Sequence, residues 1–261
     1  MKPQETADNL FAEGQAASEE KKRSAQGFWK RYFSFYDTLN EALPYRRMIE
    51  RHAELLAPRR GELVLDAGTG TGNVAVELLK SGAHVVGIDF VESALEMCRV
   101  KAPQGEFRFG DLTQPLEFAD DHFDKIACCC VLHVLNRDAQ EFAVKEFFRV
   151  VKPGGTVAVT AFAKGFNPNK VYLETLRQKR QTSGLLDALL FTFRHSVNTA
   201  RILYYVWRIR RREQSGEYDF LSPEELKQML ESAGFEVVTT ERIFASQCAT
   251  ALARKPASAS S

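Results

Sequence analysis

Apolar and polar residues follow two rhythms along the middle of the chain. Short apolar runs of strand length occur there, and amphipathic stretches with helical spacing follow most of them. The expected strands are 63–66, 84–89, 106–110, 123–135 with its exit loop, and 156–162. The expected helices between them are 74–79, 91–101 and 139–151. Strands that alternate with helices predict a doubly wound α/β domain, which we place at residues 59–163.

Two segments precede this domain. Residues 1–27 are polar, and we expect them to be mobile at first and then to form a surface helix. Residues 28–58 are amphipathic and aromatic, which predicts a helical cap of two helices interrupted around Pro44.

Residues 164–220 form an insert with a continuous helical stripe of apolar side chains. Its members are Leu186, Leu190, Phe193, Val197, Ala200, Tyr204 and Trp207. Arg208 and Arg210–Arg212 follow at once. Two interpretations stay open. Residues 185–212 make peripheral contact with an anionic membrane or wall a lipophilic pocket, or they are a lid packed on the domain, with arginines solvated or paired to the acidic amino-terminal segment.

The carboxyl-terminal part returns to the α/β pattern. Ser222, Pro223 and two acids begin a helix that ends at Gly234. Residues 235–244 and 247–253 predict an antiparallel pair of strands that completes the sheet, so 221–255 belongs to the same fold. The tail 256–261 is expected to be disordered.

Composition narrows the class of protein. The 261 residues are 44% hydrophobic and 26% charged, as in soluble globular proteins, and a net charge of +1 gives no argument for nucleic-acid binding. Met1–Glu20 lacks the apolar core of a secretory signal. Cys128, Cys129 and Cys130 are consecutive, so their side chains alternate between faces and form neither a metal cluster nor a disulfide framework. We expect a reducing, cytoplasmic compartment.

A glycine loop lies at the first strand–helix junction. Asp66 ends the strand, and Gly68, Gly70 and Gly72 follow at alternate positions. This spacing differs from the G-x-G-x-x-G of dinucleotide sites. A carboxylate here would serve a pyrophosphate poorly and an ammonium group well. S-adenosylmethionine has an ammonium group and no phosphate.

Residues 64–72 resemble motif I of the class I S-adenosylmethionine-dependent methyltransferases. Two further segments resemble motifs of the same superfamily. They are the fourth strand and residues 149–155, which read Arg-Val-Val-Lys-Pro-Gly-Gly before an apolar strand. The resemblance implies a Rossmann-like, seven-stranded, mostly parallel sheet with an antiparallel last strand, and a helical cap over the cofactor mouth. Tyr36-Asp37-Thr38-Leu39-Asn40 looks like the Tyr-Asp-x-x-Asn stretch of the ubiquinone/menaquinone C-methyltransferases. For Tyr36 an aromatic core contact is the alternative.

Two further acids end the next strands. Asp89 lies 21 residues beyond Gly68, where an acid is placed to bind ribose hydroxyls. Asp111 ends the third strand, and the resemblance implies that it accepts a hydrogen bond from the adenine amino group. The predicted cofactor-binding set is Tyr36, Asp66, Ala67, Gly68, Thr69, Gly70, Gly72, Asp89, Phe90, Asp111, Leu112, Cys129 and Cys130. No metal site is predicted.

His133 is the candidate catalytic base, since an imidazole titrates near neutral pH. The alternative is a loop histidine that packs or caps. Methyl transfer from a sulfonium depends chiefly on alignment, so no base is required. We expect the cysteines to act in core packing, with Cys129 and Cys130 touching the methionine end of the cofactor mainly through their backbone.

The sequence thus predicts a methyltransferase with a small lipophilic acceptor, such as a quinone precursor or a lipid. Cys130-Val131-Leu132-His133-Val134 departs from the Phe-Gly-x-Arg-Asn of the quinone enzymes. This departure bears on the acceptor and not on the cofactor. The alternatives are a nicotinamide-dependent oxidoreductase and a non-catalytic cofactor-binding protein of the same fold.

Overall fold

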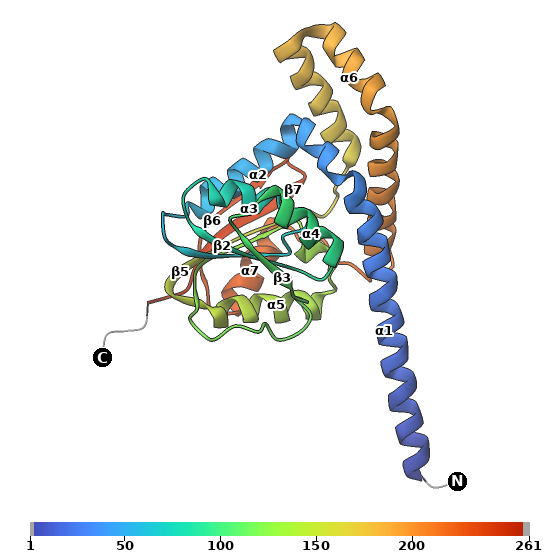
Figure 1. The fold of residues 1–261 in the computed structure, drawn as a ribbon, viewed down its shortest axis with the longest axis vertical. Coiled ribbons are helices and arrows are strands. Elements are labelled where there is room, and N and C mark those ends of the chain that lie inside the picture. Colours follow the sequence, from blue (N-terminus) through green and yellow to red (C-terminus); the bar gives the residue numbers. More distant parts are fainter. Residues whose placement is uncertain (1–2, 258–261) are drawn as a thin grey trace.

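The computed structural model describes residues 3–257 of the chain (Figure 1). Within these residues one sheet of seven strands has the order β3-β2-β1-β4-β5-β7-β6. The strands are β1 (Leu63–Ala67), β2 (His84–Asp89), β3 (Glu106–Phe109), β4 (Phe123–Cys129), β5 (Val151–Phe162), β6 (Glu236–Ile243) and β7 (Cys248–Arg254). Strand β7 is antiparallel to β5 and β6, whereas β1 to β5 are parallel. The predicted sheet, with its reversed last strand, is confirmed.

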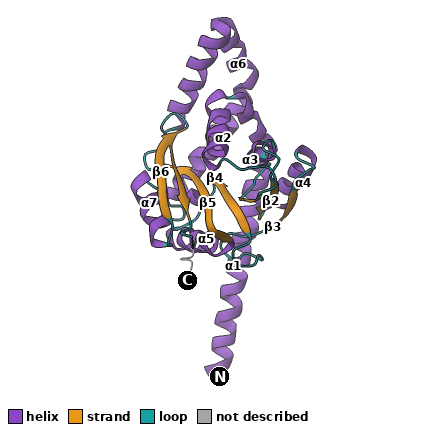
Figure 2. Cartoon of the chain, turned by 90° about the vertical axis from the view of Figure 1, so that its left-hand side faces the viewer, coloured by secondary structure: helices purple, strands orange, loops and turns teal. Residues whose placement is uncertain are grey.

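Helices cover both faces of the sheet (Figure 2). They are α1 (Pro3–Tyr36), α2 (Leu43–Leu56), α3 (Asn73–Leu79), α4 (Glu92–Lys101), α5 (Arg137–Val150), α6 (Pro168–Gln214) and α7 (Pro223–Ser232), with short 3-10 helices η1 (Asp37–Glu41) and η2 (Leu132–Val134). Buried residues of α2, α3 and α4 pack with Val64 on one face, and those of α5 and α7 pack with Leu65 on the other. The alternation also divides Cys128 from Cys129.

The junction of α5 and β5 differs from the expected turn. Lys152–Gly155 lies inside β5, where the pairing with β4 shifts between Phe123 and Lys125. Gly154 has a φ of 78°, so the glycine makes a bulge in the strand instead of separating helix from strand.

The amino-terminal helices break at a different place from the one predicted. Helix α1 runs from Pro3 through residue 28 to Tyr36 without interruption, and the chain turns in η1. Pro44 is the second residue of α2, not the site of the break. A proline in the first helical turn loses no hydrogen bond, because the N–H groups there have no partner within the helix.

Helix α6 forms a hairpin that protrudes beyond the sheet, at the end opposite the start of α1 (Figures 1 and 2). The two halves meet at Gly184, whose φ of 88° and ψ of 173° are not helical. After this kink the descending half lies against α1, where Tyr205 contacts Phe28, Tyr32 and Phe35. No helix within residues 3–257 is long and apolar enough to cross a membrane.

Candidate functional site

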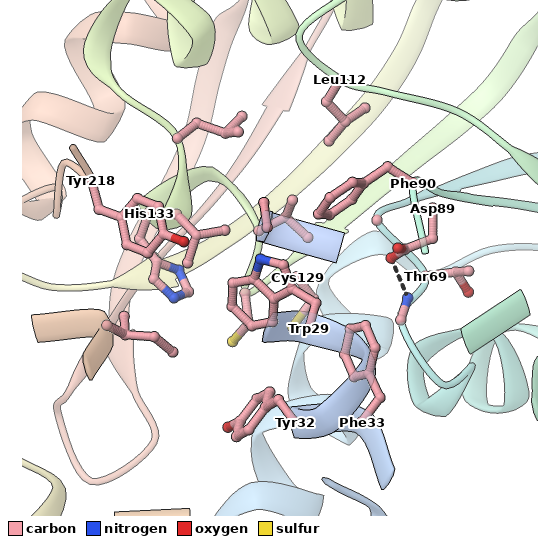
Figure 3. Close-up of a pocket in the computed structure, with 18 of the residues that line it drawn as sticks. Trp29, Tyr32, Phe33, Thr69, Asp89, Phe90, Leu112, Cys129, His133 and Tyr218 are labelled. Atoms are coloured by element: carbon pink, nitrogen blue, oxygen red, sulfur yellow. Dashed lines mark hydrogen bonds between the residues drawn. The ribbon is translucent and has the colours of Figure 1, made fainter. Parts of the chain in front are cut away.

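A cavity of about 490 Å³ opens at the carboxyl ends of β1, β2 and β4. This is the point at which the strand order reverses, because β1 lies between β2 and β4. Open α/β sheets bind ligands at such a point. Figure 3 shows Thr69 and Asp89 on one side of the cavity, His133 and Tyr218 on the other, and aromatic side chains of α1 between them.

The glycine loop is the floor of the cavity on the β1 side. Gly68 and Thr69 donate backbone hydrogen bonds to the carbonyl oxygen of Ile88, at 2.8 and 2.9 Å. Gly68 has a φ of 78°, and a Cβ there would lie 2.3 Å from a methyl group of Val131. Only glycine fits this position, because a side chain would meet both backbone strain and a clash.

Asp66 supports this loop from below. Its carboxylate accepts a hydrogen bond from the Thr69 hydroxyl at 2.7 Å and another from the backbone of Ala75, in the first turn of α3. Burial raises the pKa of Asp66 to about 7. The alternation along β1 places its side chain on the face of the sheet that α3 covers. The carboxylate was expected to line the cavity, but it does not. Its predicted contact with the ammonium group stays a prediction.

Asp89 lies at the edge of the cavity, at the end of β2. Its carboxylate accepts hydrogen bonds from the backbone N–H groups of Gly70 and Val91, both at 2.9 Å. Burial raises the pKa of Asp89 to about 6. The backbone of Phe90 also donates to this carboxylate. An ionised carboxylate has about four acceptor sites, so acceptor capacity remains for a ligand that donates.

Asp111 faces the same cavity from the end of β3, and α1 reaches it. Lys22 forms an ion pair with Asp111 at 3.0 Å, and Thr113 donates from its backbone and hydroxyl to the other carboxylate oxygen. Burial by itself would raise the pKa of Asp111, but the hydrogen bonds from Thr113 and Lys22 hold it below its usual value. The part of α1 that carries Lys22 therefore closes one side of the cavity.

The polar groups of this cavity suit an adenosyl ligand. Asp89 and Asp111 accept hydrogen bonds, and both line the cavity together with Phe90 and Leu112. Ribose hydroxyls and an adenine amino group are donors, whereas a pyrophosphate would be repelled by two carboxylates. The volume lies within the range of about 300–1,000 Å³ that is usual for small-molecule sites.

A polar network fastens η1 to the glycine loop. One carboxylate oxygen of Asp37 accepts hydrogen bonds from Thr71 at 2.7 Å and from Lys101 at 2.9 Å. Asn40 donates to the Asn73 side chain at 3.0 Å. The Tyr-Asp-x-x-Asn stretch thus joins the helical cap to the floor of the cavity.

Comparison with known proteins gives the family. The model of a family described as "Methyltransferase domain" matches residues 64–155. The ubiquinone/menaquinone biosynthesis C-methyltransferase UbiE of Paracoccus denitrificans is 31% identical over 63% of this chain and 69% of its own length. The chain belongs to the class I S-adenosylmethionine-dependent methyltransferases. The predicted family is confirmed, and with it the methyl donor that the family uses.

Other relatives agree with this family. The UbiE protein of Roseobacter denitrificans is 32% identical over 57% of this chain, which spans only 63% of that protein. A TehB-like S-adenosylmethionine-dependent methyltransferase from Corynebacterium glutamicum has the same fold, with a TM-score of 0.57. It is 18% identical over 87% of this chain and 97% of its own.

Most of the predicted cofactor-binding residues lie together in the cavity. Those that line it are Tyr36, Gly68, Thr69, Gly70, Asp89, Phe90, Asp111, Leu112, Cys129 and Cys130. Ala67 and Gly72 join Asp66 outside the lining. Ala67 is fully buried in β1. A Cβ at Gly72 would lie 3.1 Å from the sulfur of Cys98, so this glycine serves the packing of α3 on α4. The roles of all these residues toward the cofactor stay predictions.

His133 lies deep in the cavity wall, in η2. Its ring stacks on Phe162 with 4.0 Å between the ring centroids, and Phe220 meets it edge-on. Burial lowers the pKa of His133 to about 4, so the imidazole is neutral at pH 7. Its Nδ1 has no hydrogen-bond partner among the described side chains and backbone. A neutral, unpaired imidazole nitrogen is available to a polar group of a ligand.

Several cavity residues were not foreseen as individual contacts. Trp29, Tyr32 and Phe33 of α1 line the cavity, as do Lys22 and Tyr218 (Figure 3). The aromatic spacing of residues 28–36 signalled a packed face of α1 without saying which side chains reach the ligand. Nothing in the local sequence marked Lys22 or Tyr218, because long-range packing brings them here.

Proposed function

We propose that the protein transfers the methyl group of S-adenosylmethionine to a small lipophilic acceptor. The observation that carries this proposal is a second cavity, of about 110 Å³, beside the first. Five residues line both, namely Tyr32, Tyr36, Tyr45, Cys130 and Phe162. A donor in the first cavity and an acceptor in the second would meet at these side chains.

The walls of the second cavity favour an apolar ligand. Both halves of α6 contribute, with Val171 before the kink and Ile202 and Val206 after it. Leu39 and Phe166 line the side of the cap and core. Apolar walls recognise a ligand by burial of its hydrocarbon surface, at about 25 cal/mol for each Å² removed from water.

The hydroxyl groups between the cavities are neutral donors and acceptors. Burial raises the pKa of Tyr36 and of Tyr45 well above the usual value. Tyr45 donates a hydrogen bond to the Tyr36 hydroxyl at 3.1 Å and accepts one from Asn73 at the same distance. This series of hydrogen bonds would orient a polar group of the acceptor toward the donor.

In the proposed reaction, S-adenosylmethionine supplies an electrophilic methyl group. When bound, the donor would give up its methyl group, with the sulfur keeping the electron pair of the broken bond and the acceptor atom supplying the pair of the new one. The chain positions the two reactants and excludes water, which accounts for most of the acceleration. His133 lines the first cavity and not the second, so its unpaired Nδ1 would accept a hydrogen bond only from an acceptor that extends past Phe162 toward the donor.

The relatives' names support a quinone precursor as one acceptor class. The matched proteins are called ubiquinone/menaquinone biosynthesis C-methyltransferases. A lipophilic acceptor also agrees with the membrane contact expected of residues 185–212, since such acceptors dissolve in bilayers. The sequence of residues 130–134 differs from the Phe-Gly-x-Arg-Asn of the quinone enzymes. The test therefore includes lipid acceptors as well as a quinol.

The test uses cofactor labelled in the methyl group, with a prenylated naphthoquinol and a total lipid extract as acceptors. We expect label in an organic-soluble product. Absence of any product, with S-adenosylmethionine binding intact by calorimetry, would favour the non-catalytic alternative. Tighter binding of NADH than of S-adenosylmethionine would favour an oxidoreductase.

A matched pair of variants assigns the acceptor to the second cavity. Thr199 lines that cavity, and its neighbour Ala200 is exposed on the same helix. Thr199→Trp should fill the cavity and lower kcat/KM for the acceptor at least about tenfold, with donor affinity unchanged. Ala200→Trp should leave both quantities unchanged. Equal losses in the two variants would refute the assignment.

A further inference from the structure

Among the side chains that the structure describes, the outer side of α6 carries the largest group of exposed apolar ones. Of the twelve large hydrophobic residues that are exposed within the described residues, nine belong to this helix. Eight lie after the kink and are called here the outer stripe: Leu185, Leu186, Leu189, Leu190, Phe193, Val197, Tyr204 and Trp207. Phe193 is 83% exposed and Leu186 is 70% exposed. Exposed apolar groups of this size mark an interaction site.

The outer stripe is not the face by which α6 packs on its own chain. That face carries Tyr205, Val206 and Ile209, which are buried. Tyr205 stacks on Tyr32 with 5.4 Å between the ring centroids. The helix is therefore apolar on both sides, and among the described residues only one of these sides packs against another part of the chain.

Basic residues border the outer stripe. Residues 177–212 contain nine arginines and lysines and a single acid, Asp187, while the whole chain has a net charge of +1. Arg194 lies one turn beyond Leu190, and Arg201 lies one turn beyond Val197; both arginines are exposed. Arg208 and Arg212 do not contribute, because their guanidinium groups lie over Phe28 at 4.9 and 4.6 Å.

We propose that the outer stripe of α6 docks on the surface of a bilayer that contains anionic lipid. Leucine and phenylalanine side chains would enter the boundary between head groups and acyl chains. Arg194 and Arg201 would extend along the interface to the lipid phosphates, with their apolar stems buried. The helix lies in the interface and does not cross it, since both arginines would otherwise enter hydrocarbon.

Charge favours a bilayer over a second copy of the chain. A symmetric dimer through the stripe would bring two excess-positive surfaces together, and Asp187 is the single acid there to oppose them. An anionic bilayer offers apolar and negative groups together, which complements both features of this surface.

Docking would also place the second cavity beside the bilayer. The opposite side of the same helix lines that cavity through Thr199, Ile202 and Leu203. A lipophilic acceptor could pass from membrane to cavity over the length of one helix. This step rests on the proposed function, whereas docking itself does not.

Flotation of the full chain with vesicles tests the docking. We expect binding to phosphatidylcholine mixed with phosphatidylglycerol at least about tenfold above binding to phosphatidylcholine alone. Phe193→Ser should lower binding about tenfold, and the double variant Arg194→Gln/Arg201→Gln should lower it by a similar factor. High salt should weaken the binding of the wild-type protein to anionic vesicles.

Two controls change equally exposed residues elsewhere. Val100→Ser removes an 85%-exposed apolar side chain from α4, and Arg59→Gln removes a surface charge next to β1. Both should bind vesicles as the wild type does. All of these positions are exposed, so the variants should fold, which circular dichroism verifies.

Three results would overturn the proposal. The first is absence of binding to either kind of vesicle. The second is binding that Phe193→Ser leaves unchanged, which would reduce the contact to charge alone. The third is a dimer, seen by light scattering, that Phe193→Ser dissociates while vesicles bind neither form. Failure of methyl transfer with vesicle binding intact would count against the proposed function only.

Discussion

The donor side and the acceptor side of the cleft are built in different ways. On the donor side, residues 66–112 supply backbone N–H groups and carboxylates at the ends of neighbouring strands. On the acceptor side, side chains of α1, η1, α2 and α6 come together from residues 32–48 and 168–206. One wall is fixed by the sheet, and the other depends on how separate helices pack.

This difference has consequences for tolerance to change. A strand end is held by ladder hydrogen bonds on both sides, so a displaced backbone atom disturbs the whole donor wall. A helix face is held by side-chain packing, for example that of Tyr205 among Phe28 and Phe35. Such a wall accepts other apolar side chains of similar volume. We therefore expect the largest losses from changes in the donor wall.

The sharpest test of this contrast is a pair of glycine variants. Gly68 and Gly154 share a φ of 78°, but a Cβ would lie 2.3 Å from Val131 at the first and would meet nothing within 4 Å at the second. Gly68→Ala should lower the free energy of unfolding by about 3 kcal/mol or more, from strain and overpacking together, and abolish donor binding.

Gly154→Ala should cost only the backbone term, about 1–2 kcal/mol, with donor binding kept. Denaturant unfolding and calorimetry measure both quantities. Equal losses of stability in the two variants would mean that the clash with Val131 does not contribute to the free energy of unfolding.

The donor wall was also the part that could be predicted from the sequence. Spacing alone placed Asp89 at the cavity edge, because successive parallel strands end on the same side of a sheet. Spacing did not predict that the carboxylate of Asp66 turns under α3. Its contact with the cofactor stays a prediction. The break between the two helices was predicted at Pro44, whereas η1 makes it. Proline does not distinguish the two cases, because it is also common in the first turn of a helix.

The acceptor wall could be predicted only as a helical pattern. Periodicity identified a stripe from Leu186 to Trp207, but it does not say which face of an all-round apolar helix is covered. Lys22 and Tyr218 reach the cavity from opposite ends of the chain. Contacts of that kind depend on packing between distant elements, which local sequence does not encode.

A smaller effect is expected from Asp89, whose carboxylate is ionised only above a raised pKa of about 6. Asp89→Ala should weaken donor binding by about 1.5–3 kcal/mol, the value of a hydrogen bond to a charged group. Ribose hydroxyls donate to the ionised form. Affinity of the wild type should therefore fall as the pH is lowered through 6, approaching tenfold for each unit below.

Lowering the pH weakens donor binding, but it has the opposite effect on the stability of the ligand-free protein. Burial disfavours the ionised carboxylate in the folded protein, so the ligand-free protein loses stability as the pH rises from about 4, the usual pKa of an aspartate, through 6. Asp89→Asn keeps the shape and removes the charge. Its donor affinity should not change between pH 5 and 7 in this way, and a slope equal to that of the wild type would transfer the titration to another group, with buried Asp66 the first to examine.

The smallest effect is expected where α1 touches the donor wall, at Lys22 and Asp111. The ion pair spans 3.0 Å, but the lysine side chain is 51% exposed, so water and salt screen it. Lys22→Met keeps the apolar stem and removes the charge. We expect a loss of stability below about 1 kcal/mol and a change in donor affinity below about fivefold. Thr113 would still hold Asp111 in place through two hydrogen bonds. Calorimetric titration at low and high salt measures the change, which should shrink as salt rises. A loss of donor binding as large as that of Asp89→Ala would show that α1 is part of the donor wall, and the division between the two sides of the cleft would no longer hold.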